Sequence, residues 1–195
     1  ANGAGKSTLL HLLQGQLKPS SGVITCDGVP INRCRDRVVL MPQRGRIDWS
    51  FPITVHQFVD LGSINRSSQP CCNRDAALQR VGLLELSARR LDALSGGQQQ
   101  RALLARTLVQ ASQIMLLDEP CAAIDPPSRE QLLRQMRQLA DSGLTLLVSS
   151  HDWGPALDHY DRVIVLDGRV LADGPPEQVR RELGHQFAPE TTGHD

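Results

Sequence analysis

The chain has 195 residues and a mass of 21.4 kDa, which fits one domain with a smaller subdomain rather than two ordinary domains. Lys and Arg number 21, and Asp and Glu also number 21. This balance excludes the charge footprint of a nucleic-acid-binding protein, and no apolar run of about 18 residues predicts a membrane span. The five cysteines lack metal-ligand spacing and the six histidines form no cluster, so we expect reduced thiols and no structural metal site.

The first third of the chain predicts a loop, a helix and two strands. The loop is glycine-rich, and an apolar helix follows it and ends near Gly15. Residues 23–26 predict a strand that enters a turn, and residues 38–41 predict a short apolar strand that Pro42 stops.

The middle of the chain changes to helical spacing. Between residues 49 and 94 the apolar side chains recur at helical intervals, and residues 67–70 interrupt them with a loop. A longer helix is predicted from Ser95 to about residue 111. We therefore expect a small helical subdomain here.

The last third alternates apolar strands with helices, which is typical of a parallel sheet covered on both faces. A hairpin turn at residues 167–169 and a last helix opened by Pro175 precede a polar tail. The predicted strands are 114–117, 144–148, 163–166 and 170–172, and the predicted helices before the turn are 128–140 and 153–157.

The opening loop carries the first candidate site. Gly5, Lys6 and Ser7 match the end of the phosphate-binding loop pattern, in which glycines let backbone N–H groups wrap phosphates. Lys6 would reach the β- and γ-phosphates, Ser7 would bind Mg²⁺, and the helix would add its positive end. The first glycine of the pattern would precede Ala1, so we expect that part of the N-terminus is missing. The alternative is a glycine-rich turn before a helix.

Two carboxylates follow the strand at residues 114–117. Asp118 and Glu119 stand where parallel sheets bind ligands, beyond the carboxyl end of a strand. Asp118 would help to hold Mg²⁺, and Glu119 would polarise the attacking water. Taken alone, the pair could equally be a solvated turn.

Residues 94–98, Leu-Ser-Gly-Gly-Gln, begin the long helix. Ser95 and Gln98 fit a capping box, which explains a helix start. It does not explain Gly96 and Gly97, because each glycine in a helix costs about 1 kcal/mol relative to Ala. Bare glycines leave the N–H groups of the first turn open to an anion, so a second phosphate-binding helix start is predicted.

In combination, these motifs resemble the nucleotide-binding subunit of an ABC transporter over the whole chain. The resemblance implies an α/β P-loop NTPase with a mostly parallel sheet flanked by helices, and a small α-helical subdomain carrying the signature motif at residues 94–98. It also implies ATP and Mg²⁺, and a head-to-tail homodimer in which the P-loop of one copy faces Ser95 and Gly97 of the other. The implied nucleotide-binding residues are Asn2, Gly3, Ala4, Gly5, Lys6, Ser7, Thr8, Ser95, Gly96, Gly97, Gln98 and Asp125.

The resemblance assigns further residues one at a time. Gln43, after the strand at residues 38–41, matches the glutamine that senses Mg²⁺ and the γ-phosphate. Asp125 matches an aspartate at the dimer interface, although the family usually has Ser where Ala122 stands. His151 matches the switch histidine that contacts the γ-phosphate. The catalytic set is therefore Glu119, His151 and Gln43, and the Mg²⁺ set is Ser7, Gln43 and Asp118.

Residues 41–55 resemble the ATPase subunits of manganese, zinc and iron importers. In those proteins this stretch meets the membrane permease, so Trp49 and Phe51 are candidates for gripping a permease helix. Packing inside the helical subdomain explains them equally well. The resemblance implies a location on the cytoplasmic face of the plasma membrane, with an extracytoplasmic metal-binding protein as an indirect partner.

Three other functions compete with transport: a soluble ABC ATPase in translation or repair, a nucleotide-gated module that does not hydrolyse, and a small-molecule P-loop kinase. The chain has only one short ATPase half, whereas soluble ABC ATPases usually have two. Glu119 argues against a module that does not hydrolyse ATP. A small-molecule kinase has no use for the motif at residues 95–97. Because the resemblance implies a preceding strand and an adenine-stacking aromatic, we expect residues 1–195 alone to be poorly stable. The predicted segments are the P-loop side (1–48), the helical subdomain (49–111), the rest of the core (112–183) and a tail (184–195).

Overall fold

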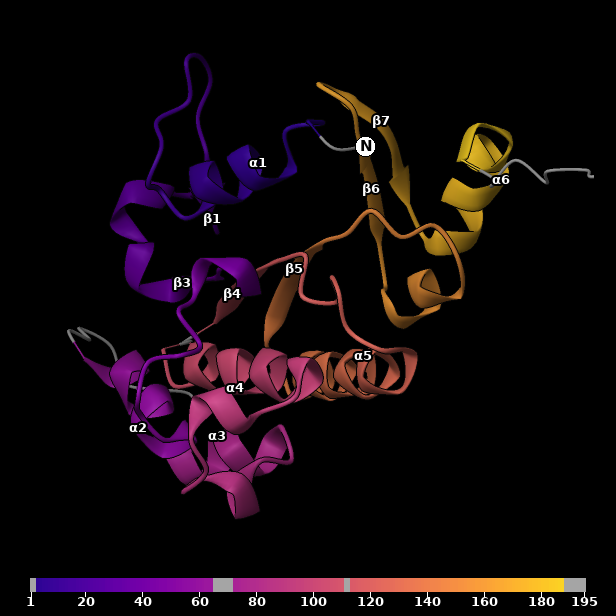
Figure 1. The fold of residues 1–195 in the computed structure, drawn as a ribbon. Coiled ribbons are helices and arrows are strands. Elements are labelled where there is room, and N and C mark those ends of the chain that lie inside the picture. The colour runs from indigo at the N-terminus through magenta and orange to yellow at the C-terminus, as the bar shows by residue number, and fades with distance from the viewer. Residues whose placement is uncertain (1–2, 65–71, 111–112, 188–195) are drawn as a thin grey trace, which may run out of the picture. The chain divides into compact units, whose positions relative to one another are not determined.

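The computed structural model describes residues 3–64, 72–110 and 113–187, with side chains described to residue 183. The chain forms two compact units. The larger unit runs from Ser7 to Ser150, and the smaller unit joins the residues up to Lys6 to those from His151 onward. Figure 1 shows the elements of both units.

A three-stranded parallel sheet forms the centre of the larger unit. Its strands are β3 (Val38–Met41), β4 (Ile114–Asp118) and β5 (Thr145–Ser149), in the order β3-β4-β5. Met41 lies opposite Leu117, and Asp118 lies opposite Ser149. The parallel sheet predicted from the apolar runs is confirmed, and the carboxyl ends of the three strands meet at one edge.

Helices cover both faces of this sheet (Figure 1). On one face, Leu10 of α1 (Lys6–Leu13) packs in a buried cluster with Val38 and Leu116. Side chains alternate between the faces of a strand, so Met115 and Leu117 project to the other face. There α4 (Gly96–Leu108) contacts β3, and α5 (Pro126–Asp141) contacts β5.

The region between β3 and α4 is helical, as its spacing predicted. It contains α2 (Val55–Asp60) and α3 (Arg74–Arg80), and both helices pack against α4. Thr54 and Asn73 cap the two helices through side-chain oxygens that accept backbone N–H bonds. The loop predicted at residues 67–70 lies outside the described residues. Helix α4 ends at Leu108, so it is shorter than expected.

The strand predicted at residues 23–26 forms over residues 25–26, and with the predicted turn it belongs to an antiparallel hairpin. Its strands are β1 (Thr25–Cys26) and β2 (Val29–Pro30), with positive φ at Asp27 and Gly28 between them, as a type I′ turn requires. The first strand is short because nothing buries Val23, whose side chain is 88% exposed.

The smaller unit contains the antiparallel pair β6 (Val163–Leu166) and β7 (Val170–Gly174), followed by α6 (Pro176–Phe187). Within the described ranges β6 pairs only with β7, so this strand does not extend the parallel sheet as the alternation suggested. A 3₁₀ turn at Pro155–His159 replaces the helix expected at residues 153–157, because the extended backbone of Gly154 delays its start. Helix α6 continues past residue 184, where the tail was expected to begin.

Candidate functional site

The opening loop has the backbone conformation that only glycine adopts at low cost. Gly3 and Gly5 have φ angles of +87° and +91°, in the left-handed region that a Cβ disfavours. No atom lies within 4 Å of the position of a Cβ at either residue, so the backbone and not packing requires these glycines. Helix α1 then begins at Lys6. Asn2, the first predicted phosphate contact, lies outside the described residues.

In the larger unit, the start of α1 is joined to the end of β4. The hydroxyl of Ser7 donates a hydrogen bond of 3.3 Å to Oδ1 of Asp118. Asp118 is only 4% exposed, yet no described residue donates a hydrogen bond to its Oδ2. The structure therefore brings together two residues that are 111 positions apart and that were both predicted to hold Mg²⁺.

Ser149 completes this cluster, although the sequence analysis did not select it. Its Oγ donates a 2.7 Å hydrogen bond to Oδ1 of Asp118 and accepts one of 3.0 Å from the backbone N–H of Glu119. Glu119 itself has a positive φ of +48°. In the sequence, Ser149 is only a polar residue at the end of an apolar strand. Its hydrogen bond to Asp118 could not be predicted, because it depends on β5 lying next to β4 in the sheet.

Gln43 emerges from the same edge of the sheet. It stands two residues beyond Met41, just as Glu119 stands two residues beyond Leu117, the register partner of Met41. The half-buried amide of Gln43 makes no hydrogen bond to any residue that the structure describes. Gln43, Asp118 and Glu119 thus follow the ends of neighbouring parallel strands, where such sheets bind ligands.

Arg44, the next residue, links three segments of the larger unit. Its guanidinium donates 3.4 Å hydrogen bonds to Oε1 of Gln99, in the first turn of α4, and to the carbonyl oxygen of Ala123, near the start of α5. Its own carbonyl oxygen accepts a 3.0 Å hydrogen bond from the indole N–H of Trp49. This role could not be predicted from the sequence, because Gln99 and Ala123 lie 55 and 79 residues away from Arg44.

The predicted capping box at the start of α4 is present. The hydroxyl of exposed Ser95 accepts a hydrogen bond from the backbone N–H of Gln98, whose side chain accepts one from the N–H of Ser95. Gly96 and Gly97, which lie between them, also pack closely against neighbouring side chains, which a Cβ would meet. A Cβ on Gly97 would lie 2.3 Å from Oγ of Ser128, and a Cβ on Gly96 would lie 2.6 Å from Nη1 of Arg44.

Asp125 caps the helix that carries Ser128. Its carboxylate accepts a 3.0 Å hydrogen bond from the backbone N–H of Ser128, and this bond, followed by the one from the Ser128 side chain, lowers the pKa of Asp125. The carboxylate is therefore charged at neutral pH. Since Ser128 also packs against Gly97, the predicted interface aspartate and the predicted signature motif adjoin within one chain.

His151 and Lys6 belong to the smaller unit, whereas Ser7, Gln43, Asp118, Glu119 and Ser149 belong to the larger one. His151 is exposed and follows β5 by two residues. Its predicted contact with the γ-phosphate stays a prediction.

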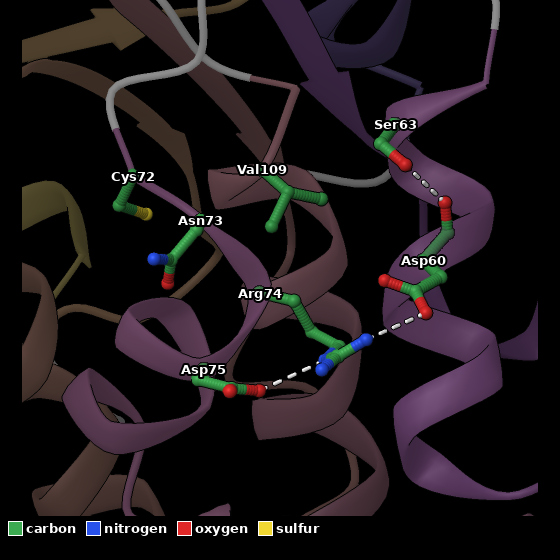
Figure 2. A pocket seen from close by; sticks show the side chains of 7 residues that line it. All are labelled: Asp60, Ser63, Cys72, Asn73, Arg74, Asp75 and Val109. Carbon is green, nitrogen blue, oxygen red and sulfur yellow. Dashed lines mark hydrogen bonds and ion pairs between the residues drawn. The ribbon is translucent and has the colours of Figure 1, made fainter.

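A separate cavity lies in the helical region. It has a volume of about 420 Å³ and lies between the end of α2, the start of α3 and the end of α4. Figure 2 shows Arg74 between the carboxylates of Asp60 and Asp75, at 2.9 Å from each. None of the predicted site residues lines this cavity, and the charges at its wall are paired with one another. It is lined by Asp60, Ser63, Cys72, Asn73, Arg74, Asp75 and Val109.

Residues 3–64, 72–110 and 113–187 contain neither a membrane-spanning helix nor a metal-binding cluster. No helix among them is long and apolar enough to cross a membrane. The same residues contain no group of three or more His, Cys, Asp or Glu side chains that could hold a metal ion.

The comparison with protein families tests the resemblance that the motifs carry. The family described as "ABC transporter" matches residues 1–122. The chain belongs to the ABC transporter family. This ABC transporter chain is 37% identical over 194 residues to the manganese transport system ATP-binding protein MntB of Listeria innocua, a match that covers 96% of the chain and 81% of that protein.

Two further comparisons agree with the assignment. The zinc transport system ATP-binding protein TroB of Treponema pallidum is 38% identical over 200 residues, covering 96% of this chain and 75% of its own. Among solved structures, cbiO1 of Clostridium perfringens, part of the ABC transporter complex cbiONQ, matches with a TM-score of 0.76 and 30% identity, covering 98% of this chain and 81% of its own. The ABC transporter chain is thus a nucleotide-binding ATPase with the α/β P-loop fold expected from its motifs, and the interpretation as a small-molecule kinase is wrong.

Proposed function

We propose that this chain is the ATP-hydrolysing subunit of an ABC importer that powers uptake of a transition-metal ion, manganese, zinc or iron, through a separate membrane permease. The observation that carries the proposal is the contact between Ser7 and Asp118, because it joins the helix of the phosphate loop to the acidic end of β4. The 37% and 38% identities to manganese and zinc transport ATPases support the choice of cargo.

The residues at the sheet edge fit Mg²⁺ bound with ATP. Mg²⁺ prefers hard oxygen ligands and keeps several waters. The hydroxyl of Ser7 and the carboxylate of Asp118 lie 3.3 Å apart, and Oδ2 of Asp118 is left without a hydrogen bond from the described residues. Gln43, at the end of the neighbouring strand, would complete the set. The backbone of residues 2–6 and the side chains of Lys6 and Thr8 would hold the phosphates.

Hydrolysis needs a base that takes a proton from the attacking water as it reaches the γ-phosphate. Glu119 fills this role in the proposal: it stands next to Asp118, and its backbone N–H is fixed by Ser149. The bound Mg²⁺ supplies charge neutralisation on the phosphate oxygens. Gln43 would position the water, and His151 would donate a hydrogen bond to the γ-phosphate.

A head-to-tail homodimer would complete each nucleotide site. Ser95, exposed at the positive end of α4, suits contact with the γ-phosphate held by a second copy. The backbone of Gly96 and Gly97, with Gln98, would lie beside it, and Asp125 would face the same interface. The subunit would then work on the cytoplasmic face of the membrane, with the helical segment 49–111 turned to the permease and an extracytoplasmic protein delivering the ion.

The cargo is tested by measuring the elemental content of cells. Cells that lack the full-length protein are grown under metal limitation, and their manganese, zinc and iron are compared with those of cells rescued by wild type, Glu119→Gln or Glu85→Gln. We expect one metal to fall and to be restored by wild type and by Glu85→Gln, whose carboxylate is exposed in the helical region, but not by Glu119→Gln. Unchanged contents in all strains would leave an ABC ATPase with another cargo or a role outside transport.

The two aromatic residues after Gln43 have different environments, which makes the permease contact testable. The ring of Trp49 lies 5.5 Å from that of Phe58 and its N–H is bonded to Arg44, whereas Phe51 is 55% exposed. Packing thus accounts for Trp49 but not for Phe51. We propose that Phe51 is an apolar anchor for a permease helix.

We expect Phe51→Ala to leave the melting temperature unchanged and to reduce co-purification with the permease. Trp49→Ala, in contrast, should lower the free energy of unfolding by about 2 kcal/mol, because it removes half-buried ring contacts. Leu61→Ala, at another exposed apolar side chain, is the control for loss of surface area. Wild-type recovery of the permease with Phe51→Ala would disprove the anchor.

A further inference from the structure

We propose that Ser149 is a positioning residue for ATP hydrolysis, which sets the orientation of the Asp118 carboxylate and of the backbone at Glu119. The inference rests on the proposed function. It begins from the place of Ser149 at the end of β5, directly opposite Asp118 in the strand register. This placement puts one hydroxyl between the two residues that the chemistry needs.

The hydroxyl of Ser149 both donates and accepts in these two contacts. A hydroxyl has one proton to donate and can accept in return. The proton goes to Oδ1 of Asp118 at 2.7 Å, and the oxygen accepts the N–H of Glu119 at 3.0 Å. Ser149 is 7% exposed and Asp118 is 4% exposed, so water cannot easily replace either bond.

The first consequence concerns the metal side of the site. Oδ1 of Asp118 accepts from both Ser7 and Ser149, which fixes the plane of the carboxylate. Oδ2 is then the oxygen left for the metal or one of its waters. Groups that orient a metal-binding carboxylate are typically worth 10–100-fold in metal affinity or activity. Loss of the Ser149 hydroxyl would free the carboxylate to rotate.

The second consequence concerns Glu119, the proposed base that accepts a proton from the attacking water. Glu119 has a φ of +48°, and a residue without glycine's freedom keeps such a conformation only where its surroundings hold it. The bond from its N–H to Ser149 is one such restraint. A side chain that takes a proton must be placed within hydrogen-bond reach of the water, so a loosened backbone at Glu119 would lower the catalytic rate.

The test separates positioning from stability with three variants of the full-length protein. Ser149→Ala removes the hydroxyl, and Ser149→Thr keeps it. Thr107→Val removes an equally buried hydroxyl that bonds only to the carbonyl oxygen of Leu103, within α4. For each protein the measurements are the melting temperature, kcat and KM for ATP, and binding of a fluorescent ATP analogue titrated with Mg²⁺ and in EDTA.

We expect Ser149→Ala to raise the half-saturating Mg²⁺ concentration about 10-fold and to lower kcat by a similar factor, with unchanged analogue binding in EDTA. Ser149→Thr should restore both values to near those of wild type, and Thr107→Val should change only the melting temperature. A wild-type Mg²⁺ requirement in Ser149→Ala, or an equal rise in Thr107→Val, would overturn the proposal. If the wild type binds the analogue but does not hydrolyse ATP, the proposed function fails and the part of the inference that concerns Glu119 fails with it, while the Mg²⁺ titration still decides whether Ser149 orients Asp118.

Discussion

Replacing Glu119 with glutamine is expected to slow ATP hydrolysis about 10³-fold, within the range that a general base contributes. Glutamine keeps the size of the side chain and the backbone bond to Ser149, so the fold and the affinity for ATP should persist. With binding intact and hydrolysis blocked, the protein should accumulate as an ATP-bound dimer. Phosphate release and size-exclusion chromatography in ATP and Mg²⁺ measure the two effects.

Two further variants make this result specific. Glu85→Gln removes an exposed carboxylate of the helical region and should hydrolyse ATP at the wild-type rate. Asp118→Asn should instead weaken Mg²⁺-dependent nucleotide binding, because it removes the negative charge and replaces Oδ2 with an amide nitrogen, while its remaining oxygen can still accept from Ser7 and Ser149. Turnover of Glu119→Gln within a few-fold of wild type would remove Glu119 from the role of base.

Gly97→Ala is expected to destabilise the larger unit by about 2–3 kcal/mol, the upper part of the range for overpacking a core. Its Cβ would lie 2.3 Å from Oγ and 2.5 Å from Cβ of Ser128, and both helices are held by other buried contacts. The gain in helix propensity from Gly to Ala, about 1 kcal/mol, is too small to offset this clash. Chemical denaturation measures the loss.

The double variant Gly97→Ala/Ser128→Gly removes both clashing atoms and should recover most of the stability. Gly96→Ala is the matched control, since its only close contact would be with Nη1 at the far end of the long Arg44 side chain, which can shift, so the free energy of unfolding should change less than in Gly97→Ala. If the double variant folds but stays inactive, the signature glycine is also needed for access to phosphate. Full activity would mean that packing against α5 alone requires it. Wild-type stability of the single variant would contradict the packing argument.

The strands of the central sheet were predictable, because each is a mainly apolar run that can be recognised without knowing its neighbours. Strand β4 is apolar over its first four residues, and a continuous apolar run is typical of a parallel strand buried on both faces. The capping box at Ser95 and Gln98 was likewise readable, since both partners lie within one turn. The backbone of Gly3 and Gly5 has the left-handed angles that a phosphate loop implies.

The contacts that the sequence did not reveal depend on tertiary neighbours. Ser149 reaches Asp118 across 31 residues only because β5 pairs with β4. The steric role of Gly97 depends on where α5 packs, which no local pattern encodes. By contrast, the antiparallel pairing of β6 with β7 was predictable, because the turn at residues 167–169 indicates a hairpin between them.

The hydrogen bonds of the Arg44 guanidinium couple the movements of three segments of the larger unit. The guanidinium joins the segment after β3 to the start of α4 and to the turn before α5 through two hydrogen bonds of 3.4 Å. At this length the bonds exceed the usual range of about 2.7–3.2 Å, so a further separation of a few tenths of an ångström breaks them. The backbone at Arg44 is also bonded to Trp49, so a displacement of the segment after β3 would act on α4 and on the turn before α5 at the same time. One side chain thus couples the three segments, and none of them can move far relative to the other two without breaking a bond to Arg44.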